Sequence, residues 1–228
     1  MKRRFATTPA NGTAETTRLA WWLALVAALI ALGYGSRIDS GKPAPDILYQ
    51  WSTAIGGLVQ DAVVLGLVLW IAGFSVQLLA LRRPSPIGRT LGYMAAAVVA
   101  IYIFEGIYVS LVHPGNEQGL TPPGWEPAHA AAYVANGIVI CVWVPLVEEL
   151  TFRGLGYSLL SRFGERPAIV LVGILFGLAH GLVLTLPVIV VFGCMLAWIR
   201  ARTGSVLPGM VVHGTFNLIA LVAAVTVS

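Results

Sequence analysis

Charged residues are scarce in this sequence: Asp, Glu, Lys and Arg make up 11% of its 228 residues. A typical soluble domain carries about 25% charged residues, so this chain lacks the polar surface that a water-soluble protein needs. Cysteine is also rare, and both copies, Cys141 and Cys194, lie within apolar runs without the spacing of a metal site. We therefore expect the two cysteines to be small packing residues.

Apolar residues, in contrast, make up 57% of the chain. They occur in blocks of membrane-spanning length, about 17 to 25 residues. The sequence therefore predicts an all-α polytopic transmembrane helical bundle (residues 18–228) after a polar cytoplasmic tail (residues 1–17). Seven spans are expected, or eight if the region after Arg153 forms a segment of its own. The predicted spans are 18–35, 55–81, 89–113, from about 128 through the segment that contains Glu148, 167–186, 187–200 and 205–227.

The net charge of +4 comes from basic residues placed between the apolar blocks. Lys and Arg concentrate in residues 2–18, 82–89, 162–166 and 200–202, whereas the loop 114–127 has none. This alternation is typical of membrane orientation signals, because cytoplasmic loops are enriched in Lys and Arg. We expect a multi-pass protein of the bacterial cytoplasmic membrane with its N-terminus inside, surrounded by lipid and not bound to nucleic acid.

Three apolar runs carry polar residues, which are costly inside a membrane and mark functional sites by default. The first contains Glu148, Glu149 and Arg153; the second Phe176 and His180; the third His213 and Asn217. At 1.5 Å per helical residue, Glu148 and His180 lie about 20 Å, and His213 about 15 Å, above the nearest cytoplasmic arginines. All three therefore lie near the middle of a hydrocarbon core that is about 30 Å thick.

The spacing within each run predicts which side chains share a helix face. Glu149 and Arg153 are four residues apart and suit an ion pair. Glu148, about 100° further round the helix, is then free to face a cavity. Phe176 with His180, and His213 with Asn217, are also four residues apart, so each pair lies on one face.

These groups suit peptide hydrolysis by an activated water. A carboxylate beside a histidine can take a proton from water. A second histidine and an amide can donate hydrogen bonds to the oxyanion that forms on an attacked carbonyl. This mechanism needs no cofactor. The alternative is a zinc site with Glu148, His180 and His213 as ligands, although their spacing lacks the pattern of compact zinc sites.

The three motifs, Glu-Glu-x-x-x-Arg at 148–153, Phe-x-x-x-His at 176–180 and His-x-x-x-Asn at 213–217, resemble those of the CPBP family. This family of all-helical intramembrane proteins contains the CAAX prenyl endopeptidases and the bacteriocin-processing and immunity proteins. The resemblance covers residues 130–222. It implies a glutamate-type intramembrane endopeptidase in which Glu148 and His180 activate the water. It further implies that His213 and Asn217 form the oxyanion hole, supported by Glu149, Arg153 and Phe176.

Two other functions stay open. The same fold can serve as a non-catalytic partner, such as a bacteriocin immunity protein or a regulator of a sensor kinase. A proton-coupled transporter is disfavoured because no inverted repeat is evident. For the protease, the substrate is a peptide or a membrane protein, and the chain resembles the bacterial branch of the family. The cleavage position and the oligomeric state do not follow from the sequence.

Overall fold

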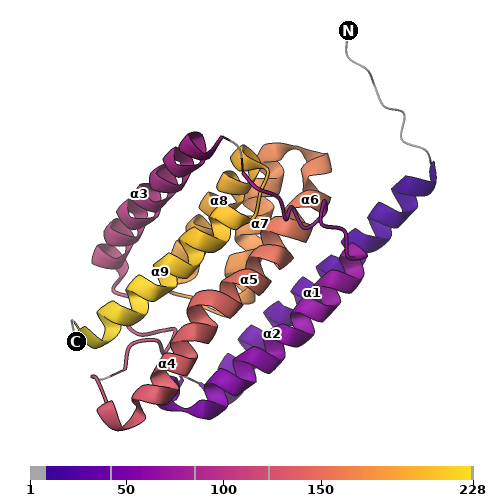
Figure 1. Cartoon of the computed structure of the whole chain (residues 1–228). Helices are drawn as coiled ribbons and strands as arrows, with labels where there is room; N and C mark the ends of the chain where they lie inside the picture. The colour runs from indigo at the N-terminus through magenta and orange to yellow at the C-terminus, as the bar shows by residue number, and fades with distance from the viewer. Residues whose placement is uncertain (1–8, 42, 85, 123, 227–228) are drawn as a thin grey trace.

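The computed structural model describes residues 9–226 other than 42, 85 and 123, and these residues form helices and loops without a strand. The predicted all-α class is confirmed. One helical segment, Pro127–Phe163, runs through the middle of the bundle (Figure 1). The other elements are α1 (Pro9–Ser40), η1 (Ile47–Tyr49), α2 (Trp51–Ala72), α3 (Ile87–Val112), α7 (Glu165–Ala179), α8 (Leu186–Thr203) and α9 (Leu207–Thr226).

The central segment is not a uniform α-helix. Its α-helical parts are α4 (Ala130–Ile138), α5 (Val144–Glu148) and α6 (Tyr157–Leu160), and 3₁₀ turns at Pro127–His129 and Ser161–Phe163 begin and end it. Two π-helical stretches, η3 (Val139–Trp143) and η4 (Glu149–Gly156), lie on either side of α5. Such π-bulges are rare and often occur at functional sites.

Six of the described helical segments are long and apolar enough to cross a membrane. The predicted fifth span corresponds to α7, which has only 15 residues. At 1.5 Å per residue it measures about 22 Å, less than the thickness of the hydrocarbon core. Residues after Arg153 continue the helical segment Pro127–Phe163 and form no separate eighth span. The protein is therefore a multi-pass helical membrane protein, but the count of seven or eight spans is not confirmed.

Three boundaries differ from the predictions. The first helix begins at Pro9, nine residues before the predicted span, while residues 1–8 of the predicted tail lie outside the described residues. The second span ends at Ala72 and not at residue 81, because Gly73 adopts the left-handed conformation (φ 61°) that closes many helices. The fifth ends at Ala179, so His180 lies at a helix end instead of inside the helix.

Helices α7 and α8 form an antiparallel pair behind the central segment, with α3 against α8 and α9 in front (Figure 1). On the other side α1 and α2 pack together and contact the central segment. Trp22 of α1 is fully buried, and its Nε1 donates a hydrogen bond to the Thr151 carbonyl over 2.9 Å. This contact ties α1 directly to the π-helical stretch beside the site.

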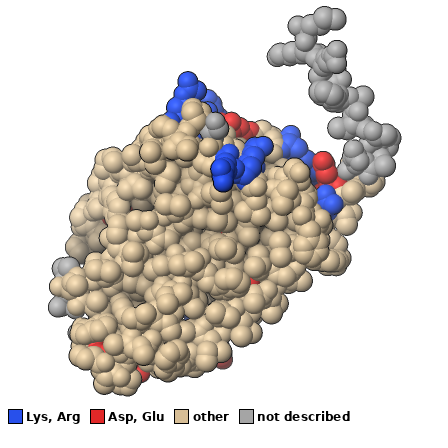
Figure 2. All heavy atoms as spheres, in the orientation of Figure 1, with Lys and Arg blue, Asp and Glu red and all other residues tan. Residues whose placement is uncertain are grey.

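The two ends of the bundle differ in charge. In Figure 2 the Lys and Arg side chains gather at one end, above a body covered with uncharged residues. Polar contacts connect the basic segments there: Arg82 Nε donates to the Gly204 carbonyl over 2.6 Å, and Arg202 pairs with Glu165 at 3.6 Å. We call this the basic end. The described loop residues 43–46, 113–122 and 180–185 lie at the opposite end.

Candidate active site

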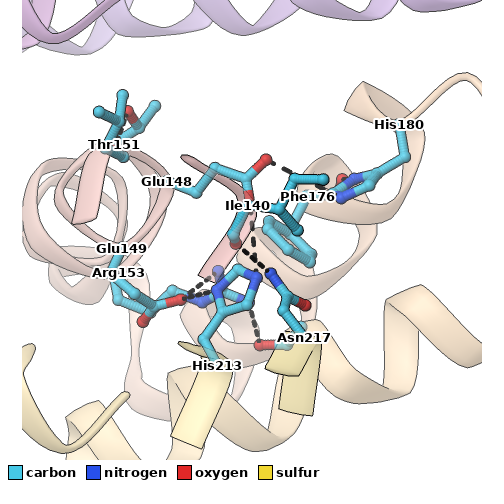
Figure 3. Close-up of polar contacts among 11 residues, drawn as sticks. Ile140, Glu148, Glu149, Thr151, Arg153, Phe176, His180, His213 and Asn217 are labelled. Atoms are coloured by element: carbon cyan, nitrogen blue, oxygen red, sulfur yellow. Dashed lines mark hydrogen bonds and ion pairs between the residues drawn. The ribbon is translucent and has the colours of Figure 1, made fainter. Parts of the chain in front are cut away.

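Glu148, at the end of α5, lies between the two predicted histidines (Figure 3). Its Oε1 is 3.9 Å from Nε2 of His180, at the end of α7, and its Oε2 is 3.6 Å from Nε2 of His213 on α9. Both distances are too long for direct hydrogen bonds. The three predicted groups from three helices therefore meet, with a gap between the carboxylate and each ring.

His180 is oriented by the backbone of its own helix. Its Nδ1 lies 2.8 Å from the Phe176 carbonyl oxygen. A carbonyl can only accept, so Nδ1 is the protonated nitrogen of this ring. In the neutral imidazole Nε2 then carries a lone pair and faces Glu148 as a second acceptor. A water molecule that donates one hydrogen to each acceptor fits this arrangement.

His213 is held by a buried ion pair. Its Nδ1 lies 3.2 Å from Glu149 Oε1, and the same oxygen accepts a hydrogen bond from Arg153 Nη1 over 2.9 Å. Glu149 and Arg153 are both 0% exposed, and they form the pair that their spacing predicted. Arg153 Nη2 also donates to the Gly193 carbonyl over 3.1 Å, and its guanidinium lies 4.0 Å from the ring centroid of Phe176.

Asn217 follows His213 by one turn of α9 and donates from Nδ2 to the Ile140 carbonyl over 2.8 Å. Pro145 explains why that carbonyl is free. In the π-helical register of η3, Val144 N–H bonds to Val139, so the next donor, for Ile140, would be residue 145. Proline has no N–H. The π-helical backbone thus presents a carbonyl without a backbone donor, and the amide of Asn217 donates to it.

Gly214 allows α9 to approach this carbonyl. A Cβ atom at position 214 would collide with the carbonyl oxygen of Cys141, which lies beside Ile140 in η3. Only glycine leaves room for such a close backbone approach. The small residue next to His213 therefore lets Asn217 reach its acceptor.

A cavity of about 320 Å³ connects these groups. Glu148, Phe176, His180, His213 and Asn217 all line it. Its remaining lining is uncharged and mostly apolar: Gln118, Leu120, Ile140, Val144, Leu182, Ile189, Phe192, Phe216, Ala220 and Leu221. Glu149 and Arg153 lie behind the wall and do not line it. The cavity is thus an apolar chamber in which one carboxylate, two imidazoles and an amide are accessible.

Residues 130–219 match the family model described as type II CAAX prenyl endopeptidase Rce1-like. That segment contains all seven residues that the sequence analysis selected, and it is less than half of the chain. The match agrees with the resemblance of its three motifs to the CPBP family. No curated protein and no solved structure gives a significant match to this chain. The family match supports a CAAX-type intramembrane protease function.

The zinc alternative requires Glu148, His180 and His213 to direct ligand atoms at one metal ion. Among the residues that the structure describes, no three His, Cys, Asp or Glu side chains are placed to hold a metal ion. Nδ1 of His180 and Nδ1 of His213 contact Phe176 and Glu149, so each ring has only Nε2 available on the Glu148 side. The arrangement does not fit a three-ligand site, so we derive no step through a metal.

Two acidic residues outside the CPBP segment were not selected from the sequence. Asp61 on α2 interacts electrostatically with Glu148, and its buried Oδ2 has no hydrogen-bond partner among the described residues. Asp61 could have been selected from the sequence, because it is a charged residue within the apolar run 55–81. Glu117, in the loop after α3, binds the loop that follows His180. No spacing rule identifies it, because these contacts connect residues 66 and 68 positions apart.

Proposed function

We propose that this protein is an intramembrane endopeptidase in which Glu148 and His180 activate a water molecule for attack on a peptide carbonyl. The observation that carries the proposal is the 3.9 Å gap between Glu148 Oε1 and His180 Nε2 at the wall of the cavity. Two acceptors at this separation can both receive hydrogens from one water. Such a water presents its oxygen lone pairs to the cavity, where a substrate carbonyl can enter.

In the proposed reaction Glu148 acts first as a general base and then as a general acid. The water oxygen bonds to the carbonyl carbon while one water proton passes to the Glu148 carboxylate. Glu148 returns that proton to the amide nitrogen as the carbon–nitrogen bond breaks. The products are a carboxylic acid and an amine. The neutral His180 ring keeps its Nδ1 proton on the Phe176 carbonyl throughout.

Charge that develops on the substrate oxygen needs hydrogen-bond donors. Asn217 uses one of its two amide hydrogens for the Ile140 carbonyl, so the second can point to the cavity. His213 donates from Nδ1 to Glu149. In the form that carries both ring protons, it also presents Nε2–H to the cavity. These two donors make up the oxyanion hole that we propose.

Glu149, Arg153 and Phe176 hold these donors instead of touching the substrate. The carboxylate of Glu149 fixes the tautomer and the angle of the His213 ring, as an acidic partner commonly does for a catalytic histidine. Arg153 neutralises Glu149 and packs on Phe176. Because catalysis depends on sub-ångström positioning, these buried supports are expected to be as necessary as the groups in the cavity.

The test is incubation of the purified protein with a panel of membrane-derived peptides, followed by mass spectrometry of the products. Glu148→Gln, His180→Ala and His213→Ala should each lower the cleavage rate by about 10²- to 10⁴-fold, the usual contribution of a general base or oxyanion donor. Glu105→Gln is the matched control, since it makes the same change in α3 on a residue outside the cavity lining. Cleavage that survives in Glu148→Gln would contradict the role of this residue as base.

The zinc version is tested on the same substrate with a strong chelator. We expect the cleavage rate to be unchanged, because the donors are not arranged to share a metal ion. Loss of activity that zinc restores would establish the metal version instead. A folded wild-type protein that cleaves no peptide of the panel would favour the non-catalytic partner.

A further inference from the structure

The cavity extends from the site in one direction only along the bundle. The central segment runs toward Phe163 at the basic end, and its cavity-lining residues Ile140 and Val144 come before Glu148. Helix α9 runs the other way, and its lining residues Phe216, Asn217, Ala220 and Leu221 come after His213. Both sets therefore lie on the side of the site that faces away from the basic end (Figure 1).

Loop residues complete the cavity on that same side. Gln118 and Leu120 belong to the loop between α3 and the central segment, and Leu182 belongs to the loop between α7 and α8. A second, adjoining cavity of about 280 Å³ shares Gln118, His180 and Leu182 with the first. It continues to Arg37, in the last turn of α1, and to Gly41, which directly follows that helix. The chamber thus leads from Glu148 to the loops at the end opposite the basic one.

On the other side the site is closed by packed side chains. Glu149, Arg153 and Leu155 are each 0% exposed, and Phe152 is 2% exposed. These residues follow Glu148 toward the basic end, and their side chains in η4 are packed inside the bundle. A substrate therefore has a connected route to Glu148 from the loop end and meets a packed core from the basic end.

The distribution of charge decides which end is cytoplasmic. Apart from Arg37, Lys42 and Arg153, the 14 Lys and Arg residues lie in the sequence at 2–18, 82–89, 162–166 and 200–202. The last three of these segments are the helix ends and connections of the basic end. Short loops enriched in Lys and Arg stay in the cytoplasm. The loop 114–127, which contributes Gln118 and Leu120 to the cavity lining, contains neither residue.

We infer that the active-site chamber opens on the non-cytoplasmic face of the membrane and receives an uncharged, apolar stretch of a peptide or membrane protein from that face. The substrate part of this inference rests on the proposed function. The lining supplies the specificity: apart from the catalytic groups it is uncharged. A charged pair lines the adjoining cavity, Arg37 with Glu117 at 2.7 Å, and because its two charges cancel it offers no net charge to a substrate.

Cysteine labelling tests the sidedness without any need for activity. In a chain with Cys141→Ala and Cys194→Ala, single cysteines are introduced by Gln118→Cys at the cavity or by Arg83→Cys at the basic end, where residue 83 is exposed. A membrane-impermeant maleimide should label Gln118→Cys in intact cells of a bacterial host. It should label Arg83→Cys only after the membrane is opened. The reverse pattern would overturn the inference.

Sided vesicles test the route of the substrate. A water-soluble peptide that the purified protein cleaves is added outside right-side-out or inside-out membrane vesicles that contain equal amounts of protein. We expect at least tenfold faster cleavage by right-side-out vesicles, and equal rates once detergent is added. Faster cleavage by inside-out vesicles would overturn the inference. If the purified protein cleaves nothing, the proposed function fails, while the labelling still decides on which face the chamber opens.

Discussion

His213 and His180 face the same carboxylate, but different parts of the molecule hold them in place. The His213 ring contacts Glu149 directly, and Glu149 is paired with Arg153 inside the bundle, with both side chains 0% exposed. The His180 ring is instead oriented by its own helix, through the bond of Nδ1 to the Phe176 carbonyl and the packing of its ring on the Phe176 ring. The loop that follows it, 181–185, is tied at the bundle's end to a second pair, Glu117 with Arg37. Each histidine is thus associated with one carboxylate–arginine pair.

The second pair works through the backbone. Glu117 Oε1 accepts hydrogen bonds from the amides of Val183 and Leu184, and its Oε2 accepts from the amide and hydroxyl of Thr185. Arg37 Nη1 donates to the Gly181 carbonyl over 3.2 Å. One support is therefore a buried pair that touches a ring, while the other is a partly exposed pair that orders a loop. We expect disruption of the first to destabilise the whole protein and disruption of the second to loosen one loop.

The largest effect is expected from Arg153→Met. This change leaves Glu149 as an unpaired charge in a fully buried position. Breaking a buried pair in this way costs about 3–5 kcal/mol, so the free energy of unfolding should fall by that amount. Denaturant titration of the purified protein in detergent measures it. Adding Glu149→Gln to the variant should restore part of the loss, because no charge then stays unpaired. An Arg153→Met protein as stable as wild type would contradict the role of this pair.

The second effect should appear in catalysis instead of stability. Glu117→Gln removes the charge, and its new amide hydrogens face the donors of Val183 and Thr185. The loop after His180 should then move, lowering kcat by roughly tenfold with little change in KM, since catalytic geometry is sensitive to small displacements. Hydrogen exchange of the amides 183–185 should accelerate about ten- to a hundredfold, because bonds to a charged acceptor contribute about 1.5–3 kcal/mol each.

Glu126→Gln is the control for that experiment. Glu126 is the other glutamate of the same loop, and it pairs with His129 at a side-chain exposure of 45%. Exposed pairs contribute about 1 kcal/mol or less, so this variant should keep the loop exchange and kcat of wild type. If Glu117→Gln accelerates exchange but leaves kcat unchanged, Glu117 orders the loop without positioning His180.

The two supports also differ in how well the sequence predicts them. The pair of Glu149 and Arg153 follows from their separation by four residues on one helix. The contact of Glu149 with His213 does not, because it depends on how α9 packs against η4. The role of Glu117 is more difficult to predict. An acidic residue in a loop rich in Pro and Gly is expected to be solvated, yet Glu117 is 7% exposed. Its four donors become available only when the α7–α8 turn folds beneath it.

The backbone around Pro145 is a second feature that the sequence does not predict. The motifs predict that Asn217 and His213 share a face of α9, and both side chains do line the cavity. Their spacing gives no reason for Asn217 to bind a carbonyl. That acceptor exists because the π-helical stretch η3 and Pro145 leave the Ile140 carbonyl without a backbone donor. A π-helix has no reliable signature in the residue pattern. Side chains on one helix were predictable, whereas backbone irregularities were not.

The next prediction concerns how the loop held by Glu117, which lies outside the membrane spans, responds to pH. Burial raises the pKa of the Glu117 carboxyl, but hydrogen bonds from Val183, Thr185 and Leu184 outweigh it and lower the pKa from 4.5 to about 2. A lowered pKa stabilises the folded loop above pH 4.5, and this stabilisation is lost as the pH falls toward 2. Exchange protection of amides 183–185, corrected for intrinsic rates, should stay constant from pH 8 to 5 and decline below 4.5. The Glu117→Gln protein should show no such decline; a decline in both proteins would point to another titrating group.

The smallest effect is expected from Arg37→Met, the counterpart of Arg153→Met at the bundle's end. The Arg37 side chain is 27% exposed, so water screens the charge that the substitution leaves on Glu117. Glu117 also keeps its four other donors around the 183–185 loop. The free energy of unfolding should therefore fall by about 1 kcal/mol or less, and kcat should change by less than about threefold. A loss as large as that of Arg153→Met, measured by the same denaturant titration, would show that the two arginines are equivalent and that burial does not separate the two supports.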